Sequence, residues 1–102
     1  MAGRDRFAVI VGTLRIDLAI YESHSLKDKR QVIKALKDRL MHRFNVSVAE
    51  VDALDSRQRA VLGVAVVGND TAFVHRCLDT VVDFVRRQGR ASLIDYQREI
   101  YY

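Results

Sequence analysis

The stretch Ser25–Val48, SLKDKRQVIKALKDRLMHRFNVSV, changes its hydrophobic period partway along and so decides the fold. In its first part, five apolar residues fall in a single sector when they are placed at 100° per residue, as on the buried face of an α-helix. These residues are Leu26, Val32, Ile33, Leu36 and Leu40. Ser25 and Asp28 form the pattern of a helix N-cap with an acidic partner in the first turn. From Phe44 the period becomes two, so the helix is predicted to end there and a strand to run to about Ala53.

Three strands and one helix are predicted around this stretch. Phe7–Tyr21 alternates between apolar and polar residues, as a strand with one buried face does. Ala60–Val67 is a nearly unbroken, valine-rich run, typical of a central strand. Thr71 to about Gln88 returns to the helical period, and Ala91–Tyr102 is the last predicted strand. The residues of that strand predicted to point inward are Ile94, Tyr96 and Ile100.

The order of the predicted elements is β-α-β-β-α-β, that of a split βαβ or ferredoxin-like α+β fold. It predicts a four-stranded antiparallel sheet with two helices on one face, in a single domain spanning residues 1–102. One detail stays open, because Glu50 and Asp52 fall in phase with the apolar residues of their strand. Either the strand leaves the core there, or a β-bulge shifts its register.

Composition and cysteine content predict a globular protein of a reducing compartment. With 49% hydrophobic and 29% charged residues, the chain has the balance of an ordinary folded domain. Its single cysteine, Cys77, cannot form an internal disulfide, which fits the cytoplasm. The first 6 residues are polar and the apolar run after them is interrupted by polar residues. Neither a signal peptide nor a membrane-spanning segment is therefore expected.

Positive charge is concentrated on the first predicted helix. The chain has a formal net charge of +4, and the segment Leu26–Arg43 holds seven of its 17 basic residues but only two of its 13 acidic ones. Spacings of three and four place four of these cations in one row along the helix. This basic row consists of Lys27, Arg30, Lys34 and Lys37. It is either a solubilising charged face or a surface that contacts the phosphates of a nucleic acid.

The chemically reactive residues form no recognisable catalytic or metal-binding motif. Hydrolysis and group transfer need a nucleophile, a base and an orienting group at one place, or a metal with three or more ligands. The histidines lie in different predicted elements, and Cys77 falls on the apolar edge of a helix, where a small buried thiol is ordinary. Glu50, Asp52 and Asp55 could approach a Mg²⁺ ion, but acids at strand ends are usually solvated. No catalytic residue, metal site or cofactor is therefore predicted, and the protein is not expected to be an enzyme.

The face of the sheet opposite the helices is predicted to combine small, apolar and charged residues. Its positions on the first strand and on the valine-rich strand are Thr13, Arg15, Asp17, Gly63, Ala65 and Val67. None of them is aromatic, so the base-stacking platform of RNA-recognition domains with similar topology is not expected. Because exposing such a face fully to solvent is unfavourable, we predict that it is buried by sheet-to-sheet packing in a homodimer.

Three runs of sequence resemble the YlxP-like family of small bacterial proteins. They are Ser25–Arg30 (SLKDKR), Arg43–Val51 (RFNVSVAEV) and Leu62–Val67 (LGVAVV), and the resemblance spans nearly the whole chain. It implies a ferredoxin-like fold and, for many relatives, a gene placed among those for translation initiation and ribosome maturation factors. The family has no established activity, so the resemblance implies no catalytic or binding residue.

Two functional hypotheses follow from these observations. In the first, the chain is a non-enzymatic, cytoplasmic accessory protein that binds ribosomal RNA or a ribosomal subunit through the basic row. In the second, it is a homo-oligomeric structural or protein-binding module without nucleic-acid binding. Neither hypothesis involves a membrane or a cofactor, and a small-ligand or enzymatic role ranks below both.

Overall fold

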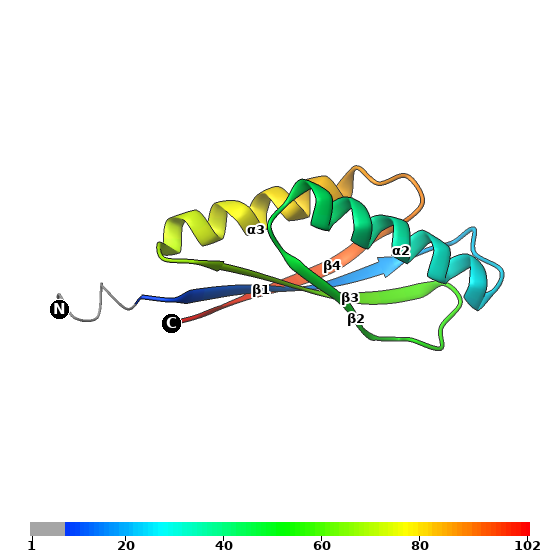
Figure 1. The fold of residues 1–102 in the computed structure, drawn as a ribbon. Coiled ribbons are helices and arrows are strands. Elements are labelled where there is room, and N and C mark those ends of the chain that lie inside the picture. The colour runs from blue at the N-terminus through cyan, green and yellow to red at the C-terminus, as the bar shows by residue number, and fades with distance from the viewer. Residues whose placement is uncertain (1–7) are drawn as a thin grey trace.

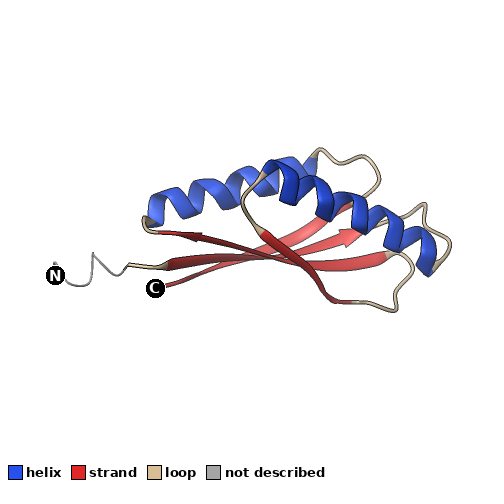
Figure 2. Ribbon diagram, viewed as in Figure 1, coloured by secondary structure: helices blue, strands red, loops and turns tan. Residues whose placement is uncertain are grey.

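A computed structural model describes residues 8–102, in which six elements follow one another in the predicted order. They are β1 (Ile10–Ala19), α2 (Leu26–Arg43), β2 (Ser47–Asp52), β3 (Arg59–Gly68), α3 (Thr71–Arg86) and β4 (Ser92–Tyr101). The strands form one antiparallel sheet in the order β2-β3-β1-β4, and both helices cover the same face of it (Figures 1 and 2). The ferredoxin-like α+β class is thereby confirmed. Phe7 and the polar residues before it lie outside the described part of the chain.

The core lies between the two helices and the central strands β1 and β3. On β1, Leu14, Ile16 and Leu18 point toward the helices and are at most 2% exposed. The predicted apolar stripes of both helices pack onto this floor, although Leu26 is only half-buried at its edge. Gly12 lets α3 approach β1 closely, because a Cβ atom there would overlap side chains of α3. Neither helix of the described chain combines the length and apolar character needed to cross a membrane.

Two edge strands contain irregularities that redirect side chains. In β4 the register with β1 shifts between Asp17 and Leu18, so that Leu93 rather than Ile94 occupies the inward position opposite Leu18. The prediction for Ile94 was wrong, because this bulge leaves its side chain 57% exposed. Tyr96 and Ile100 do pack against the core, as predicted.

The question left open for β2 is answered by a second bulge. Its register with β3 shifts between Glu50 and Asp52, where Val51 has no cross-strand partner. Glu50 lies before the bulge and points inward, in phase with Val48, whereas the bulge turns Asp52 to the outer face, where it contacts Arg15. The inward carboxylate of Glu50 determines how α2 is attached to the sheet.

Candidate nucleic-acid interface

α2 begins at a capped N-terminus that fixes the orientation of the residues after it. The Ser25 hydroxyl accepts a hydrogen bond from the Asp28 N–H at 3.0 Å. The Asp28 carboxylate accepts one in return from the His24 N–H at 3.3 Å. These two bonds satisfy backbone donors at the start of the helix, as the sequence pattern predicted.

Lys29 is the cation of α2 that the fold buries. Its side chain is 0% exposed, and its Nζ lies 2.7 Å from a carboxylate oxygen of Glu50. Nζ also donates to the carbonyl oxygens of Ala53, Leu54 and Arg59 at 2.9, 3.3 and 3.2 Å. An ammonium group can remain in a core only with such partners, because burying it unpaired is very costly. Lys29 therefore attaches α2 to the β2–β3 hairpin and is not available to a ligand.

The hairpin that Lys29 holds contains an unfavourable backbone conformation. Ala53 has a φ of 57°, in the left-handed region that costs an L-residue about 1–2 kcal/mol. The Ala53 carbonyl is one of the acceptors of the Lys29 ammonium. Gln58, later in the same loop, donates from its side-chain amide to the carbonyls of Tyr21 and Ser23 at 3.0 and 3.1 Å. The loop is thus held from both the helix and the β1–α2 connection.

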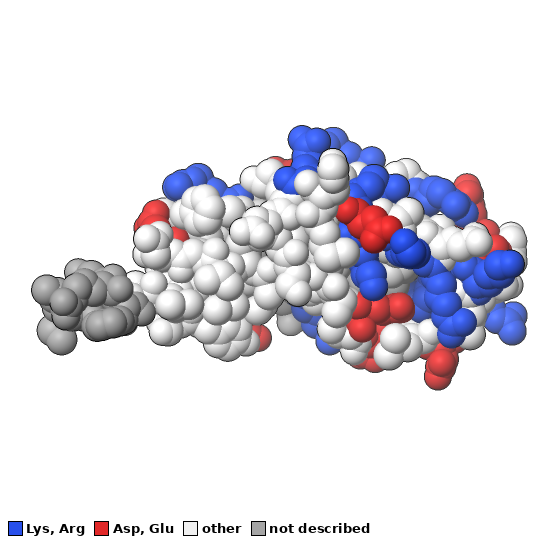
Figure 3. Space-filling view, in the orientation of Figure 1, with Lys and Arg blue, Asp and Glu red and all other residues white. Residues whose placement is uncertain are grey.

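The predicted basic row lies largely on the surface. Lys27, Arg30 and Lys34 are exposed and Lys37 is half-buried. Lys34 contacts Asp38 at 2.7 Å, and this hydrogen bond raises the pKa of Lys34. Within residues 8–102, no carboxylate lies within 4.0 Å of the charged groups of the other three. Figure 3 shows basic side chains spread over the part of the molecule that contains α2, and mostly uncharged surface toward the end near the C-terminus.

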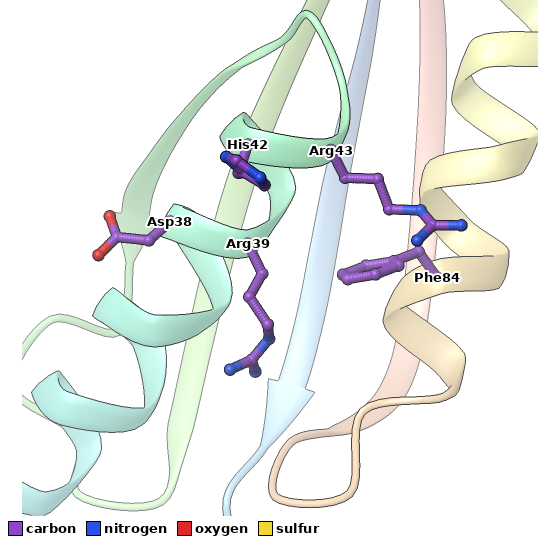
Figure 4. Close-up of a pocket in the computed structure, with 5 residues that line it drawn as sticks. All are labelled: Asp38, Arg39, His42, Arg43 and Phe84. Atoms are coloured by element: carbon purple, nitrogen blue, oxygen red, sulfur yellow. The ribbon is translucent and has the colours of Figure 1, made fainter.

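The remaining cations of α2 lie on its other flank, facing α3. The Arg43 guanidinium carbon lies 5.5 Å from the ring centroid of Phe84 and 6.0 Å from that of Phe44. The two rings meet edge to face with their centroids 5.6 Å apart. Arg39 Nε donates to the Gln88 side-chain oxygen at 3.1 Å. An open groove of about 700 Å³ between the helices is lined by Asp38, Arg39, His42, Arg43 and Phe84 (Figure 4).

All six residues predicted on the open sheet face are placed there by the strand register. Thr13 pairs with Ala65 and Arg15 pairs with Gly63 across β1 and β3. Arg15 also contacts Asp52 at 3.3 Å and lies 4.0 Å from Asp17. Val67 is 61% exposed, while the small residues beside it line a shallow hollow of about 250 Å³. The members of the hollow on this face include Thr13, Ser47, Ala49, Val51, Gly63 and Ala65.

The acids considered as magnesium ligands are directed to different places. Glu50 contacts the buried Lys29, Asp52 contacts Arg15 on the outer face, and Asp55 is exposed in the hairpin loop. Within residues 8–102, no group of three or more histidine, cysteine or acidic side chains has the geometry to hold a metal ion. Cys77 is half-buried and packs against the core.

Sequence reasoning missed two features of this region. It counted Lys29 only among the seven basic residues of Leu26–Arg43 and assigned it no role, although Lys29 falls three and four residues before Val32 and Ile33, within the apolar stripe. A lysine in that stripe, together with Glu50 on the inward phase of a strand, was a readable signal of a buried pair. The groove had no comparable signal, because it depends on how α2 and α3 align.

Comparisons with known proteins agree with the fold and the resemblance. Residues 11–98 match the family described as "Protein of unknown function (DUF503)". The "Uncharacterized protein YlxP" of Bacillus subtilis (strain 168) is 33% identical over 76 residues, which cover 74% of this chain and 83% of that protein. Among solved structures, the de novo designed protein Foldit4 matches with a TM-score of 0.50 and 12% identity, and the match covers 92% of this chain and 97% of that chain. At this identity the similarity shows the fold alone. The chain therefore belongs to the YlxP-like DUF503 family.

Proposed function

We propose that this protein is a non-enzymatic, cytoplasmic accessory protein that binds RNA of the ribosome through the outer face of α2. The basic row supplies the contacts, and they are made to backbone phosphates rather than to bases. Such contacts position a protein on RNA without reading its sequence.

One observation carries this proposal: within residues 8–102, three of the four cations of the basic row have no carboxylate within 4.0 Å, and Lys34 is the member that is paired, with Asp38. Lys27 and Arg30 are exposed, and within residues 8–102 neither forms an ion pair. Their charge is therefore accessible to a phosphate, unlike that of Lys29, which is buried and paired with Glu50. The gene neighbourhood implied by the family resemblance supports RNA of the ribosome as the polyanion, since it places many relatives beside translation factors.

The experiment measures the affinity for purified ribosomal RNA at low salt of two double variants, each of which replaces two basic residues by glutamate. Lys34→Glu with Lys37→Glu reverses half of the basic row and is expected to abolish binding, because like charges then face the phosphates. Arg57→Glu with Arg76→Glu reverses two exposed cations outside α2 and is expected to retain most of it. Circular dichroism must show both variants folded. Equal loss in the two variants would mean that net charge, and not the α2 surface, governs binding.

A second candidate is a homodimer formed through the open sheet face, and it is favoured by the exposed apolar residues there. Val67 is 61% exposed and Val51 is 50% exposed beside the hollow. Burying such residues against a second copy removes apolar surface from water. Sedimentation equilibrium tests this, since Val67→Arg is expected to convert a dimer into a monomer. A monomeric wild-type protein at high concentration would reject the candidate.

A further inference from the structure

The groove between α2 and α3 has a chemistry that the basic row lacks. It combines planar groups with positive charge, whereas the row offers charge alone. In Figure 4, Arg43 extends from α2 toward Phe84 on α3, Arg39 extends into the space between the two helices, and Asp38 points away from both. Asp38 is also already paired with Lys34 at 2.7 Å. The charged side chains directed into the groove, Arg39 and Arg43, are therefore cationic.

Arg43 provides an exposed planar surface at one end of the groove. Its guanidinium lies against the Phe84 ring, which is itself held edge to face by Phe44. Packing on an aromatic ring limits the rotation of an arginine side chain and leaves the other side of the guanidinium plane free. Unpaired bases in RNA stack on arginine planes and on aromatic rings in this way.

Arg39 provides a positioned charge beside this surface. Its Nε is bonded to Gln88, and the Gln88 side-chain amide in turn donates to the Phe84 carbonyl at 3.0 Å. Within residues 8–102, the terminal nitrogens of Arg39 have no hydrogen-bond partner. A guanidinium held by one nitrogen and free at the others is suited to a phosphate oxygen. Arg39 lies one helical turn before Arg43, so both groups act within the same groove.

We infer that the groove binds one unpaired nucleotide of RNA, with its base stacked on the Arg43 guanidinium, which Phe84 supports from the other side, and its phosphate on Arg39. This inference rests on the proposed function and refines it by naming single-stranded RNA as the preferred class. A base inside a duplex is already stacked and cannot enter the groove. The basic row contacts duplex and single strand alike, since both have phosphates.

The test compares oligo-uridine, which is unpaired, with an RNA duplex of the same length, using fluorescence anisotropy. Arg43→Lys keeps the charge and removes the planar surface. We expect it to weaken oligo-uridine binding by about fivefold or more, from the loss of one stacked base, and to leave duplex binding within about twofold. Lys34→Glu with Lys37→Glu is expected to weaken binding of both RNAs.

A measurement on the unmodified protein avoids any effect of the substitutions on folding. Oligo-uridine is expected to shift the NMR signals of the Phe84 ring and leave those of Phe73, exposed at the other end of α3, unchanged. The groove inference is wrong if oligo-uridine does not shift the Phe84 ring signals and Arg43→Lys binds oligo-uridine as the wild type does. The proposed function still stands in that case, provided that the charge reversals on α2 abolish binding. If only Arg43→Lys weakens binding, the groove stands and the basic row is wrong. If the wild type binds neither RNA at low salt, both are overturned.

Discussion

Replacing Lys29 by methionine removes the ammonium group that attaches α2 to the β2–β3 hairpin and retains most of the apolar stem. The Glu50 carboxylate, 13% exposed, loses its partner, as do three backbone carbonyls. Breaking a buried ion pair from one side costs about 3–5 kcal/mol. We take the lower end, about 3 kcal/mol, because Glu50 retains some contact with water. A domain of this size is stable by about 5–15 kcal/mol, so this is a large fraction of the total.

The measurement is urea unfolding followed by circular dichroism. Lys29→Met should lower the unfolding midpoint without changing the dependence on urea, and should lower the melting temperature by roughly 12 °C or more. Lys34→Met is the matched control, since it removes an exposed pair of the same helix, and no measurable change is expected. Adding Glu50→Leu to Lys29→Met should recover part of the loss, because the unpaired carboxylate is then gone. Equal midpoints for Lys29→Met and the wild type would refute the buried attachment.

Three further outcomes are expected. Gly12→Val should lower the urea midpoint strongly, because a side chain at this position overlaps side chains of α3. Gly89→Val is the control and should leave the midpoint unchanged, because a Cβ atom at Gly89 meets no atom within 4 Å. Ser25→Ala should cost about 1 kcal/mol in the same assay through loss of the N-cap, and an unchanged midpoint would show that the cap is not formed. In an NMR titration, Asp38→Asn should lower the pKa of Lys34, which the hydrogen bond to Asp38 now raises above 10.5. Because the folded state binds the Lys34 proton more tightly than the unfolded state, the contribution of this pair, too small to detect in the Lys34→Met control, is complete below the unfolded pKa and disappears as the pH rises through the folded pKa.

The order of elements could be predicted because each segment has a clear hydrophobic period. Periods near 3.6 and of two distinguish the helices from the strands without any knowledge of tertiary contacts. The inward position of Ile94 could not be predicted in the same way. A bulge adds one residue to a strand and reverses the sides that follow, and its place depends on the pairing with β1.

The candidate site was predictable only in its outline. The row of cations follows from helical spacing, and its exposure is as expected for Lys27, Arg30 and Lys34. The burial of Lys29 could have been predicted only by combining its place in the apolar stripe with the inward phase of Glu50 on another element, because the spacing within one helix does not identify the partner. The groove depends on Arg43 meeting Phe84, two residues brought together only by the packing of α2 on α3.

The salt dependence of RNA binding tests most directly whether the outer face of α2 contacts phosphates. Each phosphate contact contributes about −0.7 to −0.9 to the slope of log affinity against log salt, so four contacts predict a slope of about −3. Lys34→Met with Lys37→Met should reduce it to about −1.5, because two contacts are lost. A wild-type slope near zero, or one that these substitutions leave unchanged, would contradict the role of this surface.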